Sequence, residues 1–470
     1  MPEVELEYVD SDSDASGEEI FYDVESYILH KAVFHNNITE LIDLLKQKIY
    51  DISEKDPHGN TALHLSIMLG HKECTKLLLT HDAPVALKNN LGWNCLAESI
   101  SFGDREIITM CLRKLKKQSR VRIEEKQPDL TNALAGIPDF YVEIKWDFHS
   151  WIPLISRFLP SDTCKLFKRN SDVRIDSTLM DFHDMRWQRG DLSFIFHGSP
   201  KKVITSSNGR KKREMYVLDN KAKKYSHISA VETDKDIEEE VDILMSSDIV
   251  SANISTKPIT FARLQGGWVY KHDKSEEVGD FETSVFGVNG MILNSRKRRE
   301  HLSKEDVLKN KAALESISKG SIQWLQQQEE LPRGRGSLIP PQKPEISWED
   351  YLNSPLEPEQ KGRHMGRPIL LKQDKKALKA SIWMTEDFPV KVEILLSILE
   401  VMAPFKHFSK LKDFINMKIP PGFPVKVEVP VLPTIAATVT FQSYREAEHD
   451  SKMFEIPSNY FEDSAHFSNM

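Results

Sequence analysis

The sequence predicts an α+β protein of several domains. A short N-terminal α-solenoid of helical repeats is followed by a β-rich antiparallel domain, a meander or partial barrel, with flanking helices. Two observations predict this fold class. Glycine and leucine positions between 59 and 103 recur at a shift of 33 residues, which is the period of a repeat solenoid. Later in the chain, short runs of alternating apolar and polar residues are separated by turn signals, which favours antiparallel strands.

The negative charge of the chain is concentrated at its N-terminus. The 470 residues carry 63 Lys and Arg against 71 Asp and Glu, for a formal charge of −8. Ten of the acids lie in residues 1–25, which hold no Lys or Arg, so the other residues have 61 acids against 63 bases, or +2. We expect residues 1–25 to be a disordered acidic tail whose serines are candidate kinase substrates. The remainder lacks the basic excess of a nucleic-acid binder, and 40% apolar residues suffice for packed cores.

The cysteines and the apolar runs indicate in which cell compartment the protein resides. The chain has no C-x-x-C spacing among its four cysteines, Cys74, Cys95, Cys111 and Cys164. This disfavours zinc and redox motifs and favours small buried side chains in an intracellular protein. The acidic N-terminus is unlike a secretory signal, and no apolar run approaches the roughly 18–20 residues of a membrane span. We therefore expect any membrane association to be peripheral or through a partner.

Residues 26–125 contain about three copies of the repeat. Four positions of the central copy return 33 residues later: Gly59, Thr61, Leu63 and Gly70 correspond to Gly92, Asn94, Leu96 and Gly103. The glycines permit the turn, and the Thr or Asn caps a helix. Thr-Ala-Leu-His at 61–64 resembles an ankyrin repeat, while Asn-Cys-Leu-Ala at 94–97 departs most from that pattern. So short a stack needs caps, which we expect from residues 106–125 or from packing on the next domain.

Repeats of this kind bind partners through turn tips and inner helices, which form a concave surface. On that surface the candidate partner contacts are His58, Asn60, Lys88, Asn90 and Trp93. An exposed tryptophan at a turn tip suits a contact anchor. The alternative is that Trp93 packs under the neighbouring loop. We expect His64 to be a structural hydrogen-bonding residue rather than a catalyst or metal ligand.

Residues 126–318 are expected to form the first part of the β-rich domain. Strand patterns lie at 173–179, 192–196, 215–218 and 268–270, and an amphipathic helix is expected at 151–158. Turn signals lie at 189–191, 208–209, 219–220, 266–267 and 289–290. Both the basic segment 199–213 and the acidic segment 232–242 are expected to be solvated loops.

A compact basic run spans Arg296 to Arg299. Three interpretations are open: a nuclear signal, a contact for anionic lipid headgroups, and the solvated start of a helix. We favour the helix start, because Ser303 and Asp306 form a cap pattern that predicts a helix to about Ser318. The residues that follow, 319–345, are rich in Pro, Gly and Gln and predict a linker.

Residues 346–470 are expected to be the C-terminal α+β part of the same domain. The sequence predicts a buried helix at 392–402, a second helix at 405–415, and two strands at 425–431 and 435–441. Pro430 lacks an amide donor, so its strand should lie at a sheet edge or carry a bulge. We hypothesise that this edge, with Val427 and Val429, or the adjacent helix groove binds an extended or helical client segment. The alternative is that these valines are ordinary core.

The sequence gives no indication of catalysis. It contains no nucleophile elbow, Walker loop, H-E-x-x-H, G-x-G-x-x-G or kinase motif set. We therefore predict a protein that is not an enzyme, with no catalytic, metal-binding or cofactor-binding residues and no cofactor.

Four further segments carry a family resemblance. They are Trp146–Leu154, Arg189–Phe196, Asn294–Leu302 and Met417–Lys426. Together with the repeats, they resemble the ankyrin repeat domain-containing protein 13 family over about residues 26–460, and its C-type members most. The ankyrin repeats alone would be a weak indication, because that module serves many functions.

The resemblance implies a non-enzymatic chaperone for newly made G protein-coupled receptors. It would bind their cytosolic segments, and those of other membrane-protein clients, at the cytosolic face of the endoplasmic reticulum, and regulate receptor biogenesis and exit. Its location would be cytoplasmic, peripheral on that membrane, with no nucleic-acid partner. Sibling members carry C-terminal ubiquitin-interacting motifs, but the residues after Phe441 lack the pattern such a motif needs, which disfavours ubiquitin binding. The alternative is an ankyrin-repeat adaptor in receptor trafficking or endocytosis without chaperone activity.

Overall fold

The computed structural model describes residues 26–470 except for 151–158, 184–185, 199–203, 206–210, 213–214, 229–232, 256–258, 268–269, 320–333, 355–364, 403–418, 433–434 and 468–470. Some predictions lie outside these described residues. They concern the acidic tail 1–25, the helices at 151–158 and 405–415, the turn at 208–209, and most of the basic segment 199–213.

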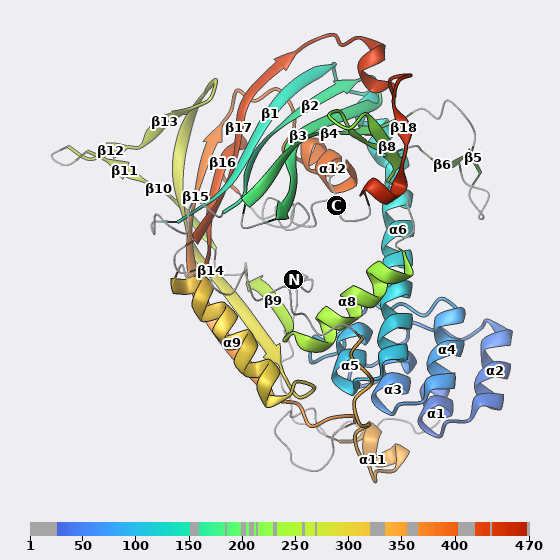
Figure 1. Ribbon diagram of the computed structural model, residues 1–470. Helices are drawn as coiled ribbons and strands as arrows, with labels where there is room; N and C mark the ends of the chain where they lie inside the picture. Colours follow the sequence, from blue (N-terminus) through green and yellow to red (C-terminus); the bar gives the residue numbers. More distant parts are fainter. Residues whose placement is uncertain are drawn as a thin grey trace.

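Three helix pairs at the N-terminal end of the described chain confirm the predicted ankyrin repeats (Figure 1). Their helices are α1 (Ile28–Phe34), α2 (Ile38–Gln47), α3 (Ala62–Met68), α4 (Lys72–Thr80), α5 (Cys95–Phe102) and α6 (Arg105–Ala135). Thr61 caps α3 through a capping box with His64, and Asn94 caps α5 by accepting from the amide of Ala97. Gly59 and Gly92 have the same positive φ, near 75°, because each forms the same turn.

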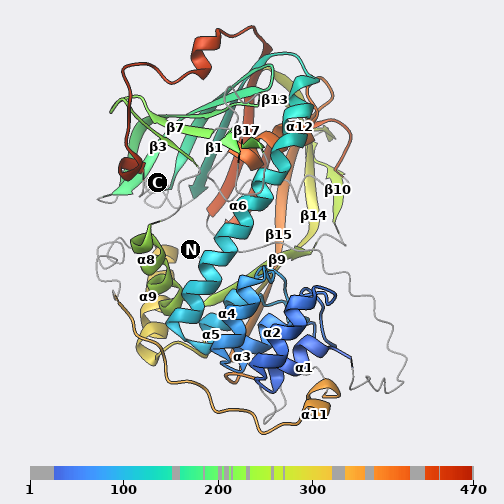
Figure 2. The ribbon, with the colours of Figure 1, turned by 90° about the vertical axis from the view of Figure 1, so that its right-hand side faces the viewer.

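The last helix of the stack, α6, is much longer than a repeat requires. Its 31 residues run about 46 Å at the usual rise per residue, from the repeats to the sheet (Figure 2). Near its end, Leu130 and Leu134 belong to the core of the sheet domain. The predicted boundary between residues 125 and 126 therefore falls inside a continuous helix, which joins the two parts as a strut.

Most of the remaining chain forms one large sheet. Its strand order is β10-β14-β15-β16-β17-β1-β2-β3-β4-β7-β8-β18, with β9 and β13 also paired to β14. All pairs are antiparallel except β8 with β18. The two end strands, β10 and β18, do not pair with each other among the described residues, so the sheet is strongly curved but not a closed barrel (Figure 1). This confirms the predicted antiparallel domain in its open, partial-barrel form.

The long strands of this sheet lie in its central part, and the short ones near its ends. In chain order, the strands of the large sheet are β1 (Phe140–Ser150), β2 (Ser161–Arg169), β3 (Asp172–His183), β4 (Arg186–Phe196), β7 (Met215–Asp219), β8 (Lys224–His227), β9 (Ile249–Ser255), β10 (Thr260–Arg263), β13 (Ser275–Val278), β14 (Phe281–Arg298), β15 (Leu371–Thr385), β16 (Phe423–Leu432), β17 (Ile435–Glu446) and β18 (Phe461–Glu462). Two small separate sheets pair β5 (Ile204–Thr205) with β6 (Lys211–Lys212), and β11 (Gln265–Gly266) with β12 (His272–Asp273).

The core of the sheet domain lies on the concave side of the sheet, where α12 (Val392–Met402) packs against α6 and β4 (Figure 1). Leu395 and Ile398 of α12 are fully buried in the same cluster as Phe441 of β17. The ring of Phe388 stacks on that of Phe423, with 3.6 Å between centroids. These elements confirm the predicted helix at 392–402 and the two predicted strands that follow Pro424.

Three local predictions in the sheet domain are wrong. The expected turn at Arg189-Gly190-Asp191 lies inside β4, where Arg189 pairs with Leu179. The expected turn at 289–290 is a bulge in β14, because the register shifts between Val288 and Met291. The acidic segment 232–242, expected to be a solvated loop, mostly forms the helix α8 (Asp234–Ser246), whose Val241 is fully buried. In each case, pairing or packing outweighs the local preference of the residues.

Other local predictions are confirmed or only partly described. The turn after Asp219 is present between β7 and β8. Ser303 and Asp306 cap the helix α9 (Lys304–Lys319) as expected. Of the expected strand 268–270, only Tyr270 is described, and it lies in a bend with 85% exposure. Among the described helices, none has the length and apolar composition that a membrane crossing requires.

Candidate functional site

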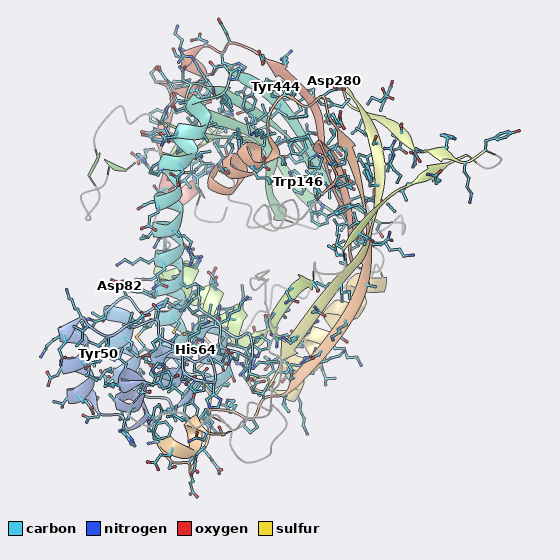
Figure 3. The ribbon with its side chains drawn as sticks, turned by 180° about the vertical axis from the view of Figure 1, so that it is seen from behind. Tyr50, His64, Asp82, Trp146, Asp280 and Tyr444 are labelled. Atoms are coloured by element: carbon cyan, nitrogen blue, oxygen red, sulfur yellow. The ribbon has the colours of Figure 1, made fainter. Side chains whose placement is uncertain are left out.

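The turns that precede α3 and α5 are held in shape by buried polar groups. The Asp56 carboxylate accepts from the amides of His58 and Asn60, at 2.9 Å each. The Asn60 side chain accepts a 3.0 Å hydrogen bond from Asn89, which takes the position of Asp56 in the next turn. His64 joins the same stack by bonding to the carbonyl of Trp93, and it lies inside the block of repeats (Figure 3). The turns therefore form a continuous ladder along the concave surface.

A distant segment of the same chain covers the first part of this surface. The short helix α11 (Trp348–Leu352) begins after Ser347, whose side chain accepts from the amide of Asp350. Trp348, Tyr351 and Leu352 are buried in the hydrophobic cluster of the repeats. Phe34, at the end of α1, lies 5.4 Å from the Trp348 ring and 5.8 Å from the Tyr351 ring, measured between centroids.

Hydrogen bonds add specificity to this packing. The Tyr351 hydroxyl donates to Asp56 at 2.6 Å and accepts from the Asn60 amide group at 2.9 Å. The His58 ring lies 4.6 Å from the Tyr351 ring, and its Nε2 lies 2.7 Å from the Tyr351 carbonyl oxygen. We call this set of contacts between α11 and Phe34, Asp56, His58 and Asn60 the α11 contact. Two of the predicted partner residues, His58 and Asn60, therefore contact the protein's own chain.

The protonation states at the α11 contact follow from its burial. Burial raises the pKa of the Tyr351 phenol well above its usual value, and the adjacent Asp56 carboxylate raises it further. Burial also raises the pKa of Asp56, although His30 and the Tyr351 hydroxyl act in the opposite direction. At neutral pH, tyrosine is therefore the hydrogen-bond donor, which is the role that its geometry requires.

The third repeat is covered by the sheet domain instead. Trp93 is only 3% exposed, and the guanidinium groups of Arg296 and Arg298 lie 5.5 and 5.1 Å from its ring centre. These arginines are the last part of β14, which is the longest strand of the sheet. The interpretation of Trp93 as an exposed anchor is wrong, and the alternative, packing under a neighbouring segment, is closer to the structure. Cation–π attraction explains why arginines cover this ring.

A buried ion-pair network accompanies Trp93. Arg298 is 1% exposed, and it donates to both oxygens of Glu98 on α5, at 2.8 and 3.0 Å. Its Nε donates to Glu300 at 2.7 Å, and Ser101 of α5 donates to the same Glu300 oxygen at 2.7 Å. Burial alone would lower the pKa of Arg298, but the two carboxylates outweigh it and hold the pKa above its ordinary value. We call this set, with Trp93 and Arg296, the β14 contact.

The predicted solvated helix start at 296–299 is therefore wrong. Arg296 and Arg298 lie in β14, and Arg299 makes a two-point ion pair with Asp248, at 2.9 Å for each bond. The sequence held one signal for this arrangement. Glu98 places a carboxylate on an inner repeat helix, where the central copy has the leucine Leu65, and such a buried acid needs a basic partner.

Residues of the predicted linker contact the turn between α5 and α6. The amide of Leu338 donates to the Gly103 carbonyl at 2.8 Å, and the Ser337 hydroxyl accepts from the amide of Arg105 at 2.9 Å. After the next undescribed segment, Arg367 donates to the carbonyls of Ser101 and Phe102 at the end of α5. The first residues of the segment, 334–338, thus contact α8 and the third repeat, whereas most of residues 339–345 are exposed. In Figure 2, this segment leads toward α11.

The other predicted partner residues have different positions. The half-buried Lys88 accepts a bond from Lys55 at its carbonyl, and the exposed Asn90 donates to the Pro57 carbonyl. Val427 is buried in the core of the sheet domain, between Ile382 and Val439 of the flanking strands. The half-buried Val429 packs against the same core.

The strand that carries these valines, β16, is paired on both sides in its first part and on one side in its last part. β16 pairs with β17 on one side and, over residues 423–428, with β15 on the other. Among the described residues, the part from Val429 onward pairs with β17 alone, and its register shifts between Pro430 and Leu432. A proline is tolerated there because no amide is needed on the open side. Because the Val427 side chain is buried, it is not available to bind a client segment.

The described residues hold no group of three or more His, Cys, Asp or Glu side chains that could bind a metal ion. All four cysteines are buried, and burial raises the pKa of both Cys111 and Cys164 to about 12. Such thiols are not activated nucleophiles. The chemistry of the site suits binding. Its concave face combines aromatic surface with a carboxylate, an amide and an imidazole.

Comparisons with known proteins agree with this architecture. The family model described as ANKRD13 C-terminal matches residues 174–469, and the model for three ankyrin repeats matches residues 29–120. Human ankyrin repeat domain-containing protein 13C is 51% identical over 444 residues, which cover 94% of this chain and 79% of the relative.

Two further relatives give the same assignment. Ankyrin repeat domain-containing protein 13C of Danio rerio is 51% identical over 445 residues, covering 95% of this chain and 88% of the relative. Ankyrin repeat domain-containing protein 13B of Mus musculus is 35% identical over 423 residues, covering 88% of this chain and 67% of the relative. The chain belongs to the ankyrin repeat domain-containing protein 13 family.

Proposed function

We propose that this protein is a non-enzymatic chaperone for newly made G protein-coupled receptors. It binds their cytosolic segments at the cytosolic face of the endoplasmic reticulum and regulates their biogenesis and exit. The observation that carries the proposal is the degree of likeness within the family: 51% identity to 13C proteins against 35% to a 13B protein. The chaperone role is the one that the resemblance to C-type members implies.

The chemistry of the repeats supports a binding role. Ankyrin repeats are interaction modules, and their concave surface here already holds one short helix, α11, through the rings of Phe34 and His58 and the polar groups of Asp56 and Asn60. The chain outside residues 1–25 is close to neutral, so shape and apolar contact dominate over long-range charge. The proposed partners include other membrane-protein clients, and association with the membrane would be peripheral, through the bound client. Nucleic acid and ubiquitin are not among the proposed partners.

The proposal is tested by following one receptor in cells in which the protein is depleted or overexpressed. A chaperone changes the amount and the glycan state of the immature receptor, because it acts before exit from the reticulum. Cell fractionation checks the location, and co-precipitation with the immature receptor checks binding. Unchanged amounts of both glycan forms, with co-precipitation absent, would contradict the proposal.

Because of the β14 contact, client binding is better mapped with point variants of the full chain than with fragments. Separate fragments cut near residue 125 would interrupt α6 and leave Arg298 and Glu98 as buried charges without each other. Since such fragments are expected to misfold, point variants of the full chain are the better reagents. Loss of binding can then be attributed to a surface.

An adaptor function is the alternative, favoured by the 35% identity to a 13B protein across 88% of this chain. An adaptor would join a partner held by the repeats to another complex in receptor trafficking or endocytosis. It would change the location or signalling of mature receptor while leaving the glycan state of immature receptor unchanged. The cellular experiment above therefore separates the two functions.

A further inference from the structure

The helix α11 occupies the repeats in the way that a bound peptide would. Its contacts with Asp56, His58 and Asn60 join residues more than 290 positions apart in the chain. It has only five residues, too few for a stable helix on its own, so its conformation depends on the surface that it meets. The surface and its occupant can therefore be considered separately.

The occupant is a small amphipathic helix. Trp348, Tyr351 and Leu352 follow the spacing of one helical face, and all three are nearly completely buried. Glu349 and Asp350 face the solvent on the other side. Positions i, i+3 and i+4 are the anchors that grooves use to recognise amphipathic helices in other proteins.

The receiving surface is built largely from contacts within the repeats. One oxygen of Asp56 accepts from the amides of His58 and Asn60, and His30 Nε2 lies 3.0 Å from the Asn60 carbonyl. None of these bonds involves α11. The second Asp56 oxygen and the Asn60 amide group are thus held in place to meet a hydroxyl between them.

The two ends of the concave surface differ in how they are covered. At the third repeat, the cover is a long sheet strand whose buried Arg298 cannot leave without separating from the Glu98 carboxylate of α5. At the first two repeats, the cover is a short helix whose removal leaves groups that water can solvate. Of these two covering segments, only α11 is short enough to be replaced by a bound peptide.

We propose that the surface formed by Phe34, Asp56, His58 and Asn60 binds a short amphipathic helix of a partner protein, and that α11 is the internal occupant which this helix displaces. The partner helix would carry two aromatic residues three positions apart, the second a tyrosine that donates to Asp56, followed by an aliphatic residue. This inference goes beyond the proposed function, because it holds for any protein partner with such a helix, whether or not that partner is a receptor.

The test uses the full chain and a fluorescein-labelled peptide of residues 344–354 as the partner helix. In the Trp348→Ala/Tyr351→Ala variant, α11 no longer competes for the surface. Because apparent affinity falls with the fraction of open surface, this variant should bind the peptide at least about tenfold more tightly than the unaltered protein. Fluorescence anisotropy measures both dissociation constants, and circular dichroism checks that both proteins are folded.

Two matched controls locate the binding. Glu349→Gln changes only the exposed face of α11 and leaves the Ser347–Asp350 cap in place, so it should leave peptide binding as weak as in the unaltered protein. Adding His58→Ala to the aromatic variant removes the ring that lies on Tyr351 without altering the turn amides, and should weaken binding about tenfold.

Equal binding by the aromatic variant and the unaltered protein, or no binding by the folded variant, overturns the proposal. So does binding that His58→Ala leaves unchanged, since the peptide then lies elsewhere. If the double variant does not fold, Tyr351→Phe alone replaces it, because it keeps the ring and removes only the hydroxyl. A smaller gain in peptide affinity is expected there, and the absence of any gain also overturns the proposal.

Discussion

The same concave face is closed at its two ends by different chemistry. The β14 contact buries a charged arginine between two carboxylates and beside a tryptophan. The α11 contact buries two aromatic rings and a hydroxyl beside one carboxylate. An ion pair that is cut off from water is costly to separate, whereas neutral groups lose far less on exposure. The difference indicates which end is a permanent joint and which end can open.

Removing the charge of the β14 contact should give the largest effect. Arg298→Met leaves Glu98 and Glu300 buried without their cation. We expect the free energy of unfolding to fall by about 3–5 kcal/mol, the usual loss when one partner of a buried pair is removed. Chemical denaturation followed by tryptophan fluorescence measures this loss.

The control for this variant is Lys372→Met, on the exposed part of β15. It removes a charge from the neighbouring strand, and its effect should stay within about 0.5 kcal/mol. A second variant, Arg298→Met with Glu98→Leu, should recover part of the loss because it removes two charges of the network together. If Arg298→Met were as stable as the control, the β14 contact would not be the permanent joint described above.

Acid should have the next largest effect, through two buried histidines that lie beside the β14 contact. Burial lowers the pKa of both His64 and His301 to about 4, from an ordinary value of 6.5. Between these values, the unfolded chain binds protons that the folded chain does not, so stability is complete above pH 6.5 and falls as the pH decreases. From pH 6.5 to 5, we expect a loss of roughly 1.5 kcal/mol for each histidine. Thermal unfolding across this range measures it.

The α11 contact should respond less to acid, because Asp56 and its neighbour His30 have opposite effects. Burial lowers the pKa of His30, so the folded state loses stability as the pH falls. Burial raises the pKa of Asp56, so this group stabilises the folded state as the pH falls. Hydrogen exchange of the α11 amides at pH 6.5 and 5 reports this contact separately. His301→Gln is the control for the global effect, and it should remove about half of the acid-induced loss. A stability that is flat with pH would contradict both assignments.

Tyr351→Phe should have the third-largest effect on stability, and this effect should be confined to the α11 contact. The variant keeps the ring contacts with Phe34 and His58 but leaves Asp56 without the hydroxyl that it accepts from. The Asn60 amide group loses its acceptor at the same time, and the expected cost is about 1–3 kcal/mol, the penalty of leaving buried polar groups unsatisfied. If α11 can undock, the loss appears as faster hydrogen exchange at Tyr351 and Asn353, with global unfolding changed little. Equal losses in local and global stability would show that α11 is as permanent as β14.

The repeats were predictable from sequence because their signals are local. Gly59 and Gly92 permit the turns, and Thr61 and Asn94 cap the helices that follow, at a period of 33 residues. Similarly, strict alternation after Pro424 indicated the pair β16 and β17. Each of these features depends on neighbours within one repeat or one hairpin, so periodicity and turn chemistry are sufficient evidence.

The candidate site was not predictable in the same way, because its two halves lie far apart in the sequence. The residues that meet Trp93 and Glu98 are about 200 positions later, and those that meet His58 and Asn60 nearly 300. A turn-tip tryptophan has the same local pattern whether a partner or the chain's own strand covers it. Likewise, Arg296–Arg299 is a basic run by composition, and only pairing within β14 makes it a buried joint.

Ser347→Ala should give the smallest effect, and it tests the α11 contact most directly. Ser347 is the N-cap of α11, where its hydroxyl accepts from the Asp350 amide at 3.0 Å, while its own side chain remains exposed. The substitution touches none of the residues that α11 meets on the repeats, so it weakens only the helical form of the occupant. Loss of a cap costs about 1 kcal/mol, which corresponds to about a fivefold larger fraction of undocked α11. Hydrogen exchange at Tyr351 should therefore accelerate about fivefold while exchange in α5 is unchanged. Acceleration in both helices would mean that the two ends of the concave face open together, and the distinction between them would fail.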